Sequence, residues 1–363
     1  MRIAFILAGM GAGGAERVVS VLAAELIERG HDITVVAFDA PEDRVYHPLP
    51  AEVRLIRLGV AKGGGRLMRG IGASIRRTVR LRSFLKQDRP DVVLSFLTKV
   101  NVLTLLASRG LDLKVVISER NNPAEQGAHP AWSWAWKKLA PCAATVVLQT
   151  EAIKSIYPPA IARKAVVIPN PVEVPQELRA RPDSKVVVGV GRLTHQKGFD
   201  RLIDAFARVA DDHPSWRLII WGEGPLRQQL ERQASRTGLA DRITFPGVSD
   251  RPAGWIEDTG IYVLSSRYEG FPNALLEAMQ GGLPVIAFDC PYGPADIVTD
   301  HRDGLLVPEG DVDLLGQAIG KLMANREIST RFAASAREKA AHYAPSQIVS
   351  KWECVMSRLY TKG

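Results

Sequence analysis

Cysteine is scarce in this sequence, and its three copies are far apart. Cys142, Cys290 and Cys354 are odd in number and form no Cys-x-x-Cys pair. This pattern argues against a disulfide framework and against a zinc site, and it favours a reducing compartment. We therefore expect a cytoplasmic protein.

Long hydrophobic runs are also absent. The apolar run near the start, residues 3–8, is too short to span a membrane and leads directly into a glycine-rich loop. It is predicted to be a first β-strand rather than a signal peptide, and no transmembrane helix is expected. With 363 residues, of which 46% are hydrophobic, the chain has the size and composition of a soluble protein with two domains.

Short apolar runs alternate with amphipathic segments in two successive series, as in parallel sheets covered by helices. Between the series lies a proline-rich stretch, residues 168–175, that is predicted to be a linker. We expect two Rossmann-like, doubly wound α/β domains that face each other across a cleft, because such sheets bind ligands beyond the carboxyl ends of their strands. The expected domains are residues 1–170 and 171–345, followed by a helix at 346–363 that packs back on the first domain. The expected strands are residues 3–8, 33–38, 53–58, 92–96, 115–118 and 145–148, and then 186–190, 217–221, 243–245, 261–264 and 284–288.

Basic charge is concentrated in the first half of the chain. Residues 1–180 contain 25 Lys/Arg and 16 Asp/Glu, whereas residues 181–363 contain 22 and 23. Much of the surplus falls within residues 62–89, whose spacing predicts a basic amphipathic helix. Such a helix can lie on an anionic membrane, bind phosphates or cover a core with a solvated face. Nucleic acid is not expected as a partner, because no DNA- or RNA-binding motif accompanies the helix. The arginines that would contact a membrane or an acceptor are Arg66, Arg69, Arg76, Arg77 and Arg80.

Three tryptophans follow within residues 131–138. Trp132 and Trp136 would share one face of a helix, as tryptophans do at a lipid interface. Packing into the core is an equally good interpretation of the same spacing.

Two glutamates eight positions apart, Glu269 and Glu277, enclose a predicted helix start. Pro272 lies between them and suits the first turn of a helix, because it has no N–H to lose. The unpaired amides of such a turn attract anions, and the carboxylates could accept hydrogen bonds from sugar and ribose hydroxyls. The segment therefore predicts either a sugar-nucleotide site or an ordinary helix with an acidic start.

A glycine-rich turn follows the first predicted strand. Gly9, Gly11 and Gly14 match the fingerprint of dinucleotide-binding proteins, and Asp39 lies where a ribose-binding acid would sit. A nicotinamide or flavin enzyme is nevertheless disfavoured, because the sequence offers no matching catalytic half.

A second turn, residues 189–198, follows the first strand of the second series. Its Arg192 and Lys197 could reach the same phosphates as the helix at Pro272 and neutralise a leaving diphosphate without a metal. The turn at residues 222–225 could likewise approach a nucleotide closely.

Together these motifs resemble the family 4 retaining glycosyltransferases of the GT-B fold, from the first strand to the last helix. The resemblance rests on residues 13–16, 191–198, 222–225, 269–277 and 303–308. Within the family, the sequences at residues 11–16 and 118–121 are most similar to those of bacterial enzymes that extend polyprenyl-diphosphate-linked oligosaccharides with a hexose or an N-acetylhexosamine.

The resemblance implies roles for individual residues. Arg192 and Lys197 would hold the donor diphosphate, Glu277 the ribose and Glu269 the donor sugar. Where many relatives carry a histidine, this chain has Glu119, which could contact a sugar, orient Arg120 towards a phosphate or form a structural pair with it. The expected catalytic residues are thus Arg192, Lys197, Glu269 and Glu119, and Arg120 joins the acceptor or membrane contacts. The expected donor-binding residues are Gly13, Gly14, Gly191, Gly222, Glu223, Val248, Gly270, Phe271, Pro272, Asn273, Ala274 and Glu277.

The implied reaction is transfer of a hexose or N-acetylhexosamine, with retention, from a nucleotide sugar such as a UDP-sugar to a lipid-diphosphate-linked saccharide. It would serve surface polysaccharide or glycan assembly, at the inner face of the cell membrane. No cofactor or metal is expected. Asp311-Val-Asp313 has the DxD form of a metal-dependent transferase, but its place before a predicted helix favours a capping role. The alternatives are a nucleotide-sugar epimerase and a non-catalytic module that binds membranes or nucleic acid.

Overall fold

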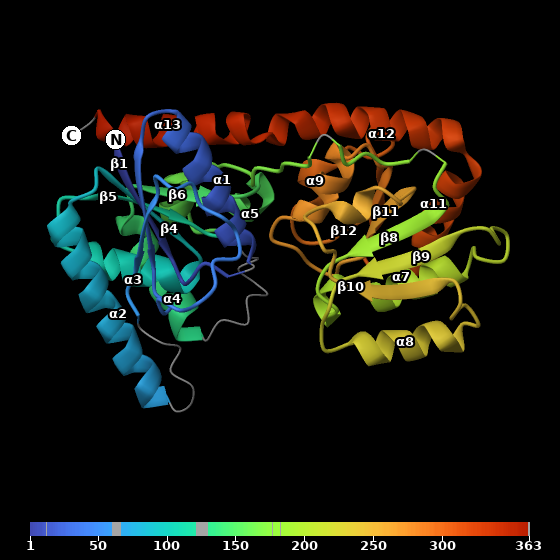
Figure 1. The fold of residues 1–363 in the computed structure, drawn as a ribbon, viewed down its shortest axis with the longest axis horizontal. Coiled ribbons are helices and arrows are strands. Elements are labelled where there is room, and N and C mark those ends of the chain that lie inside the picture. The colour runs from blue at the N-terminus through green and yellow to red at the C-terminus, as the bar shows by residue number, and fades with distance from the viewer. Residues whose placement is uncertain (12, 60–66, 121–129, 176, 182, 362–363) are drawn as a thin grey trace. The chain divides into compact units, whose positions relative to one another are not determined.

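The computed structural model describes residues 1–361 apart from residues 12, 60–66, 121–129, 176 and 182, and only the backbone of residues 67–71. The chain divides into two compact units, each built on one parallel sheet (Figure 1). Unit 1 comprises Met1–Pro171 and Pro345–Gly363, and unit 2 comprises Val172–Ala344. The prediction of two doubly wound α/β domains is confirmed.

The sheet of unit 1 has the strand order β3-β2-β1-β4-β5-β6-β7. The order reverses between β1 and β4, which is where open α/β sheets bind ligands. Each predicted strand of the first series matches an observed strand to within one residue at either end; β7 was not predicted, because its apolar run is too short to stand out. The strands are β1 (Arg2–Leu7), β2 (Asp32–Ala37), β3 (Arg54–Arg57), β4 (Val92–Phe96), β5 (Lys114–Ser118), β6 (Thr145–Leu148) and β7 (Ala165–Val167).

Helices cover both faces of this sheet. Figure 1 shows α1 and α13 on one face and α2, α3 and α4 on the other. From α13, the side chains of Ile348, Trp352 and Met356 are fully buried in the core between this helix and the sheet, where the Trp352 ring lies 6.0 Å from that of Phe96. The helices are α1 (Gly14–Glu28), α2 (Leu67–Asp88), α3 (Thr98–Ser108), α4 (Pro130–Leu139), α5 (Glu151–Ser155), α6 (Pro159–Ala162) and α13 (Pro345–Tyr360).

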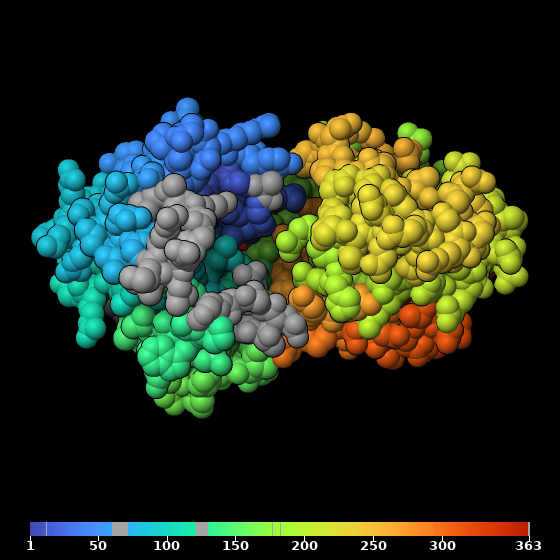
Figure 2. Space-filling model, turned by 90° about the horizontal axis from the view of Figure 1, so that it is seen from below, coloured from blue at the N-terminus to red at the C-terminus, as the bar shows by residue number. Residues whose placement is uncertain are grey.

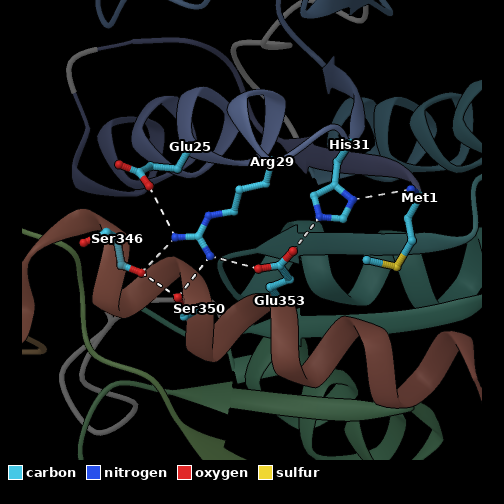
Figure 3. A network of polar contacts seen from close by, with 7 residues as sticks. All are labelled: Met1, Glu25, Arg29, His31, Ser346, Ser350 and Glu353. Atoms are coloured by element: carbon cyan, nitrogen blue, oxygen red, sulfur yellow. Dashed lines mark hydrogen bonds and ion pairs between the residues drawn. The ribbon is translucent and has the colours of Figure 1, made fainter.

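A polar network also holds α13 against unit 1 (Figure 3). Arg29 Nη1 donates a hydrogen bond to Glu353 Oε2 at 2.8 Å, and His31 Nε2 lies 2.9 Å from Glu353 Oε1. Arg29 Nη2 also donates to the Ser346 carbonyl oxygen at 3.0 Å. The hydrogen bonds from His31 and then Arg29 lower the pKa of Glu353, so this carboxylate is ionised at neutral pH.

The sheet of unit 2 has the order β10-β9-β8-β11-β12-β13, with its reversal between β8 and β11. All five predicted strands of the second series are present; three have the predicted bounds, and two end one or two residues later. β13 was not predicted. The strands are β8 (Val186–Val190), β9 (Arg217–Trp221), β10 (Ile243–Gly247), β11 (Ile261–Leu264), β12 (Val285–Asp289) and β13 (Leu305–Pro308).

Two apolar layers enclose this second sheet. One contains Phe206, Leu230 and Leu315, from α7, α8 and α11, and the other contains Leu275 and Met279, from α9. The loops that follow β8, β9 and β11 lie at the carboxyl edge, and they carry many of the residues predicted to bind the donor. The helices are α7 (Phe199–Ala207), α8 (Arg227–Arg236), α9 (Asn273–Gln280), α10 (Pro294–Ile297), α11 (Val312–Ala324) and α12 (Arg326–Ala340).

Candidate functional site

Lys197 and Glu269 form an ion pair at the carboxyl edge of the unit 2 sheet. Lys197 Nζ lies 2.7 Å from Glu269 Oε1, which also accepts a hydrogen bond from Ser266 Oγ at 2.6 Å. The Glu269 side chain is only 5% exposed. Lys197 was predicted to bind the diphosphate and Glu269 the sugar. The fold of unit 2 therefore brings together two predicted ligands that are 72 positions apart in the sequence.

The backbone around Glu269 is held by the loop that follows β12. The Glu269 amide donates to the Pro291 carbonyl at 2.9 Å, and the Tyr292 amide donates to the Glu269 carbonyl at 3.0 Å. Glu269 is thus fixed by its backbone as well as by its carboxylate.

Helix α9 begins at Asn273, directly after Pro272, so the predicted helix start is confirmed. The Pro272 carbonyl accepts a hydrogen bond from the Leu275 amide at 3.1 Å. Glu277 is the fifth residue of the helix and is buried. Gly270, Phe271 and Ala274, the other donor-binding predictions here, lie in or next to this first turn.

Arg192 follows β8 in the loop that leads to Lys197. Its side chain is exposed, and within the described part of the chain it has no ion-pair partner. Gly191 has φ +153°, and a Cβ there would lie 3.1 Å from the Lys197 side chain. The loop therefore presents one paired and one unpaired cation at the same edge of the sheet.

The loop after β9 packs tightly against the loop after β8. Gly222 has φ +138°, and a Cβ there would lie 1.9 Å from the Gly191 carbonyl oxygen. Glu223 Oε1 accepts a hydrogen bond from Arg227 Nη1 at 2.5 Å. Val248 is exposed just after β10. Gly222 and Glu223 therefore lie in the loop that follows β9, the neighbour of β8, and Val248 follows β10, the next strand along the sheet.

Tyr262, on β11, is a residue that sequence reasoning missed. Burial, followed by the charges of Glu269 and Glu277, raises its pKa well above the ordinary value. Its buried hydroxyl has no hydrogen-bond partner among the described residues. A tyrosine within an apolar strand gives no sign of this in the sequence.

In unit 1, the glycine loop is supported by Asp39. Asp39 Oδ2 accepts a hydrogen bond from the Met10 amide at 3.0 Å, and a Cβ at Gly9 would lie 3.1 Å from the same oxygen. Asp39 therefore supports the backbone of the glycine loop. Gly13 caps α1 and Gly14 begins it.

Glu119 and Arg120 are both buried after β5, but they contact different elements. Glu119 Oε2 accepts a hydrogen bond from Thr98 Oγ1, on α3, at 2.8 Å. The Arg120 guanidinium lies 5.5 Å from the Phe96 ring and 5.4 Å from the Trp352 ring. Burial lowers the pKa of Arg120 to about 9. Arg120 is only 8% exposed, with its guanidinium beside both rings, so the membrane contact predicted for it does not fit the structure.

The exposed face of α2 combines apolar and basic side chains. Ile75 and Val79 are 59% and 57% exposed, and Arg76 and Arg80 are exposed beside them. Arg77 is half-buried. Figure 2, seen from below, shows α2 and α4 contributing to the surface of unit 1. Arg69 is in α2 without a described side chain, and Arg66 lies outside the described residues.

The tryptophans of α4 do not form the predicted lipid-facing pair of Trp132 and Trp136. Trp136 is buried, with its ring 4.9 Å from that of Tyr157, so the core interpretation holds for it. Trp132 lies under the Lys99 ammonium at 5.1 Å, and Trp134 is 65% exposed. Within the described helices, none combines the length and apolar composition needed to cross a bilayer.

The two aspartates of the DxD pattern have separate structural partners. Asp311 caps α11 by accepting a hydrogen bond from the Leu314 amide at 2.9 Å, which confirms the capping interpretation. Asp313 forms an ion pair with Arg208, the residue that caps the end of α7.

Two doubly wound domains with glycine-lined carboxyl edges define the GT-B class of α/β proteins. Residues 13–171 match the family model of the glycosyl transferase 4-like domain, and residues 173–339 match that of the glycosyl transferases group 1. The two matches together cover almost the whole chain, which therefore belongs to the group 1 glycosyltransferases of GT-B fold.

Several curated proteins are similar over the full length. The chain is 28% identical over 359 residues to the amylovoran biosynthesis glycosyltransferase AmsD of Erwinia amylovora, covering 95% of this chain and 96% of that protein. It is 26% identical over 357 residues to the GalNAc-α-(1→4)-GalNAc-α-(1→3)-diNAcBac-PP-undecaprenol α-1,4-N-acetyl-D-galactosaminyltransferase of Campylobacter jejuni, covering 97% of each. It is also 34% identical over 229 residues, 61% of its length, to the exopolysaccharide phosphotransferase SCO2592 of Streptomyces coelicolor, but spans only 24% of that protein.

Solved structures confirm the fold. The sucrose-phosphate synthase of Thermosynechococcus elongatus superposes with a TM-score of 0.86 at 18% identity, covering 100% of both chains. HepE of Anabaena, in complex with UDP and glucose, gives 0.82 at 20% identity, covering 98% of this chain and 99% of that one.

Proposed function

We propose that this glycosyltransferase moves a hexose or N-acetylhexosamine from a UDP-sugar to a saccharide on a lipid diphosphate, in the assembly of a bacterial surface polysaccharide or glycan. The observation that carries the proposal is the Lys197–Glu269 ion pair beside the start of α9. AmsD supports the polysaccharide context, the Campylobacter enzyme supports a diphosphate-linked acceptor, and the UDP complex of HepE supports the nucleotide.

The donor would occupy the carboxyl edge of the unit 2 sheet. Arg192 and Lys197 are the cations that would bind its diphosphate, assisted by the positive end of the α9 dipole. Glu269 and Glu277 would accept hydrogen bonds from the donor sugar and the ribose. The buried carboxylates would thus position the donor, while the cations and amides offset its charge.

The chemistry would be substitution on one face of the sugar, with retention. The bond between the anomeric carbon and the diphosphate oxygen breaks, the acceptor oxygen bonds to that carbon, and the departing oxygen takes the acceptor's proton. Arg192, Lys197 and the helix amides would stabilise the charge that develops on the diphosphate. Glu269 is already held by Lys197 and Ser266, which favours positioning over nucleophilic attack. Asp311 and Asp313 are engaged in structural contacts, which supports a metal-independent reaction.

The acceptor would approach from the membrane through unit 1. Ile75 and Val79 could enter the interface while Arg76 and Arg80 contact anionic headgroups or the acceptor diphosphate, and Trp134 adds a second exposed anchor. The protein would then be peripheral at the cytoplasmic face of the membrane.

Donor hydrolysis and transfer assays test the site. Glu277→Ala and Arg192→Ala should each reduce turnover of UDP-sugars by at least about tenfold, since each removes a charge-assisted contact. Arg232→Ala, which changes an exposed arginine of α8, is the matched control and should leave turnover unchanged. Undiminished turnover in both site variants would refute the proposed site, and conversion of the donor sugar without an acceptor would indicate an epimerase instead.

Liposome flotation tests the membrane contact. Binding should favour anionic over neutral vesicles, weaken with salt, and fall when Arg76 and Arg80 are both changed to glutamine. A double change of Arg326 and Arg331, exposed on α12 of unit 2, removes the same charge and should have no effect. Equal binding to neutral vesicles would count against an electrostatic anchor.

A further inference from the structure

Arg267 joins the loop of Glu269 to the start of α7, just beyond Lys197. Its guanidinium donates two hydrogen bonds to the Asp200 carboxylate, from Nη1 to Oδ1 at 2.8 Å and from Nη2 to Oδ2 at 2.6 Å. Nη1 also donates to the His195 carbonyl at 2.8 Å. One side chain therefore contacts residues on both sides of Lys197.

Backbone and side-chain hydrogen bonds continue this connection. The Arg267 amide donates to the Gln196 carbonyl at 2.8 Å, and Gln196 Nε2 donates to the Tyr268 carbonyl at 3.1 Å. Ser265 Oγ donates to the Lys197 carbonyl at 3.0 Å. The two loops are thus joined at several successive positions, of which Arg267 supplies both a backbone and a side-chain contact.

The Arg267–Asp200 pair is charged and largely enclosed. The side chains are 16% and 34% exposed. The hydrogen bond to Asp200 is the main cause of a raised pKa at Arg267. For Asp200, burial acts to raise the pKa, but the hydrogen bonds and charge of Arg267, with two backbone amides, outweigh it and lower the pKa. A planar, bidentate pair of this kind fixes orientation as well as distance, which a lysine could not do.

We propose that Arg267 and Asp200 are positioning residues that hold the loops of Lys197 and Glu269 at the separation needed for sugar transfer from the bound donor. The proposal rests on the proposed function of that site. Arg267 acts through Lys197 and Glu269, since its guanidinium is bound by Asp200 and the His195 carbonyl. The 2.7 Å contact between Lys197 and Glu269 depends on where two separate loops lie, and this clamp links those loops.

A donor-independent experiment measures the clamp directly. Acetylation of the Lys197 amine by a small acylating reagent is followed by mass spectrometry on the folded full chain. Glu269 holds the Lys197 amine in an ion pair, so acetylation of this amine is slow while the two loops keep their positions. Arg267→Gln and Asp200→Asn should each accelerate acetylation of Lys197 about tenfold, because each removes a charge-assisted contact. Arg267→Lys keeps the charge without the bidentate geometry and should give an intermediate rate.

The matched control is Asp313→Asn. It removes a carboxylate from the pair that Asp313, on α11, forms with Arg208 at the far end of α7, and should leave Lys197 acetylation unchanged. Steady-state kinetics add a second measurement: in both clamp variants kcat should fall about tenfold while KM changes far less, as expected when geometry in the transition state is lost.

The outcomes separate the clamp from the function. Unchanged Lys197 acetylation in Arg267→Gln and Asp200→Asn, with or without a loss of thermal stability, would overturn the clamp. Accelerated acetylation in both, in a protein that turns over no nucleotide sugar, would support the clamp and refute the proposed function. If Arg267→Gln does not fold, the rates of Lys197 acetylation in Arg267→Lys and Asp200→Asn test the clamp instead.

Discussion

Replacing Gly198 by alanine should push apart the two loops that hold Lys197 and Glu269. Gly198 has φ +61°, and a Cβ there would lie 2.1 Å from the Ser265 carbonyl oxygen. Atoms that are not bonded stay more than about 3 Å apart, so this carbonyl must retreat by about 1 Å. Ser265 lies only four residues before Glu269, so the displacement should reach the ion pair.

The cost has two separate sources. An alanine in the left-handed region costs about 1 to 2 kcal/mol, and overpacking against a fixed carbonyl adds about 1 to 3 kcal/mol. Gly198→Ala should therefore lower the free energy of unfolding of unit 2 by about 2 to 5 kcal/mol. Transfer activity should fall with it, because Lys197 and Glu269 no longer meet at 2.7 Å.

Gly238→Ala separates the two sources. Gly238 also has a left-handed backbone, φ +75°, but no atom lies within 4 Å of the position of its Cβ, and it belongs to the same unit. It should show the backbone cost alone and retain activity. Urea unfolding of the full chain, with hydrogen exchange read on peptides of unit 2, measures both variants. Equal destabilisation of the two would refute the steric argument.

Three further outcomes are expected. Tyr262→Phe removes a buried hydroxyl without a described partner, so unit 2 should be unchanged or up to about 1 kcal/mol more stable by urea unfolding; a loss above that would mean that the hydroxyl is bonded. Glu353 has a lowered pKa, so its stabilising contribution is present at neutral pH and is lost as the pH falls below its ordinary value of 4.5. Amide exchange in α13 should accelerate over that range, and Glu353→Gln should exchange fast already at pH 7; a wild type insensitive to acid would contradict this. Trp352→Ala should cost unit 1 about 3 to 5 kcal/mol by the same unfolding assay, because it empties a fully buried site; a loss under about 1 kcal/mol would show that α13 docks without it.

Sequence periodicity could locate most strands because their short apolar runs are bounded by glycine, proline and polar turns. It did not identify β7 and β13, which have three and four residues. In α4 the spacing predicted that Trp132 and Trp136 share a face, but not whether that face points inward. In the structure Trp134 is the most exposed of the three. Hydrophobic periodicity predicts which side chains share a face of a helix, whereas tertiary packing decides which face is buried.

For the candidate site, the resemblance identified residues but not their contacts. Lys197 and Glu269 were predicted as ligands of different donor groups, and nothing in their spacing indicates that they pair with each other. Arg267 and Asp200 were missed because hydrogen bonds between loops 67 residues apart leave no local pattern. Arg120 was predicted as an acceptor or membrane contact, whereas it is buried beside two rings that come from distant segments of the chain.

The packing of α13 has a consequence for the order in which the protein can fold. Unit 1 is discontinuous, since its core includes Trp352 and Met356 from beyond the end of unit 2. During synthesis from the N-terminus, unit 2 can close as soon as Ala344 has emerged, but the core of unit 1 stays incomplete until α13 follows. The first half of the chain must therefore wait, with apolar surface uncovered, until α13 has been made.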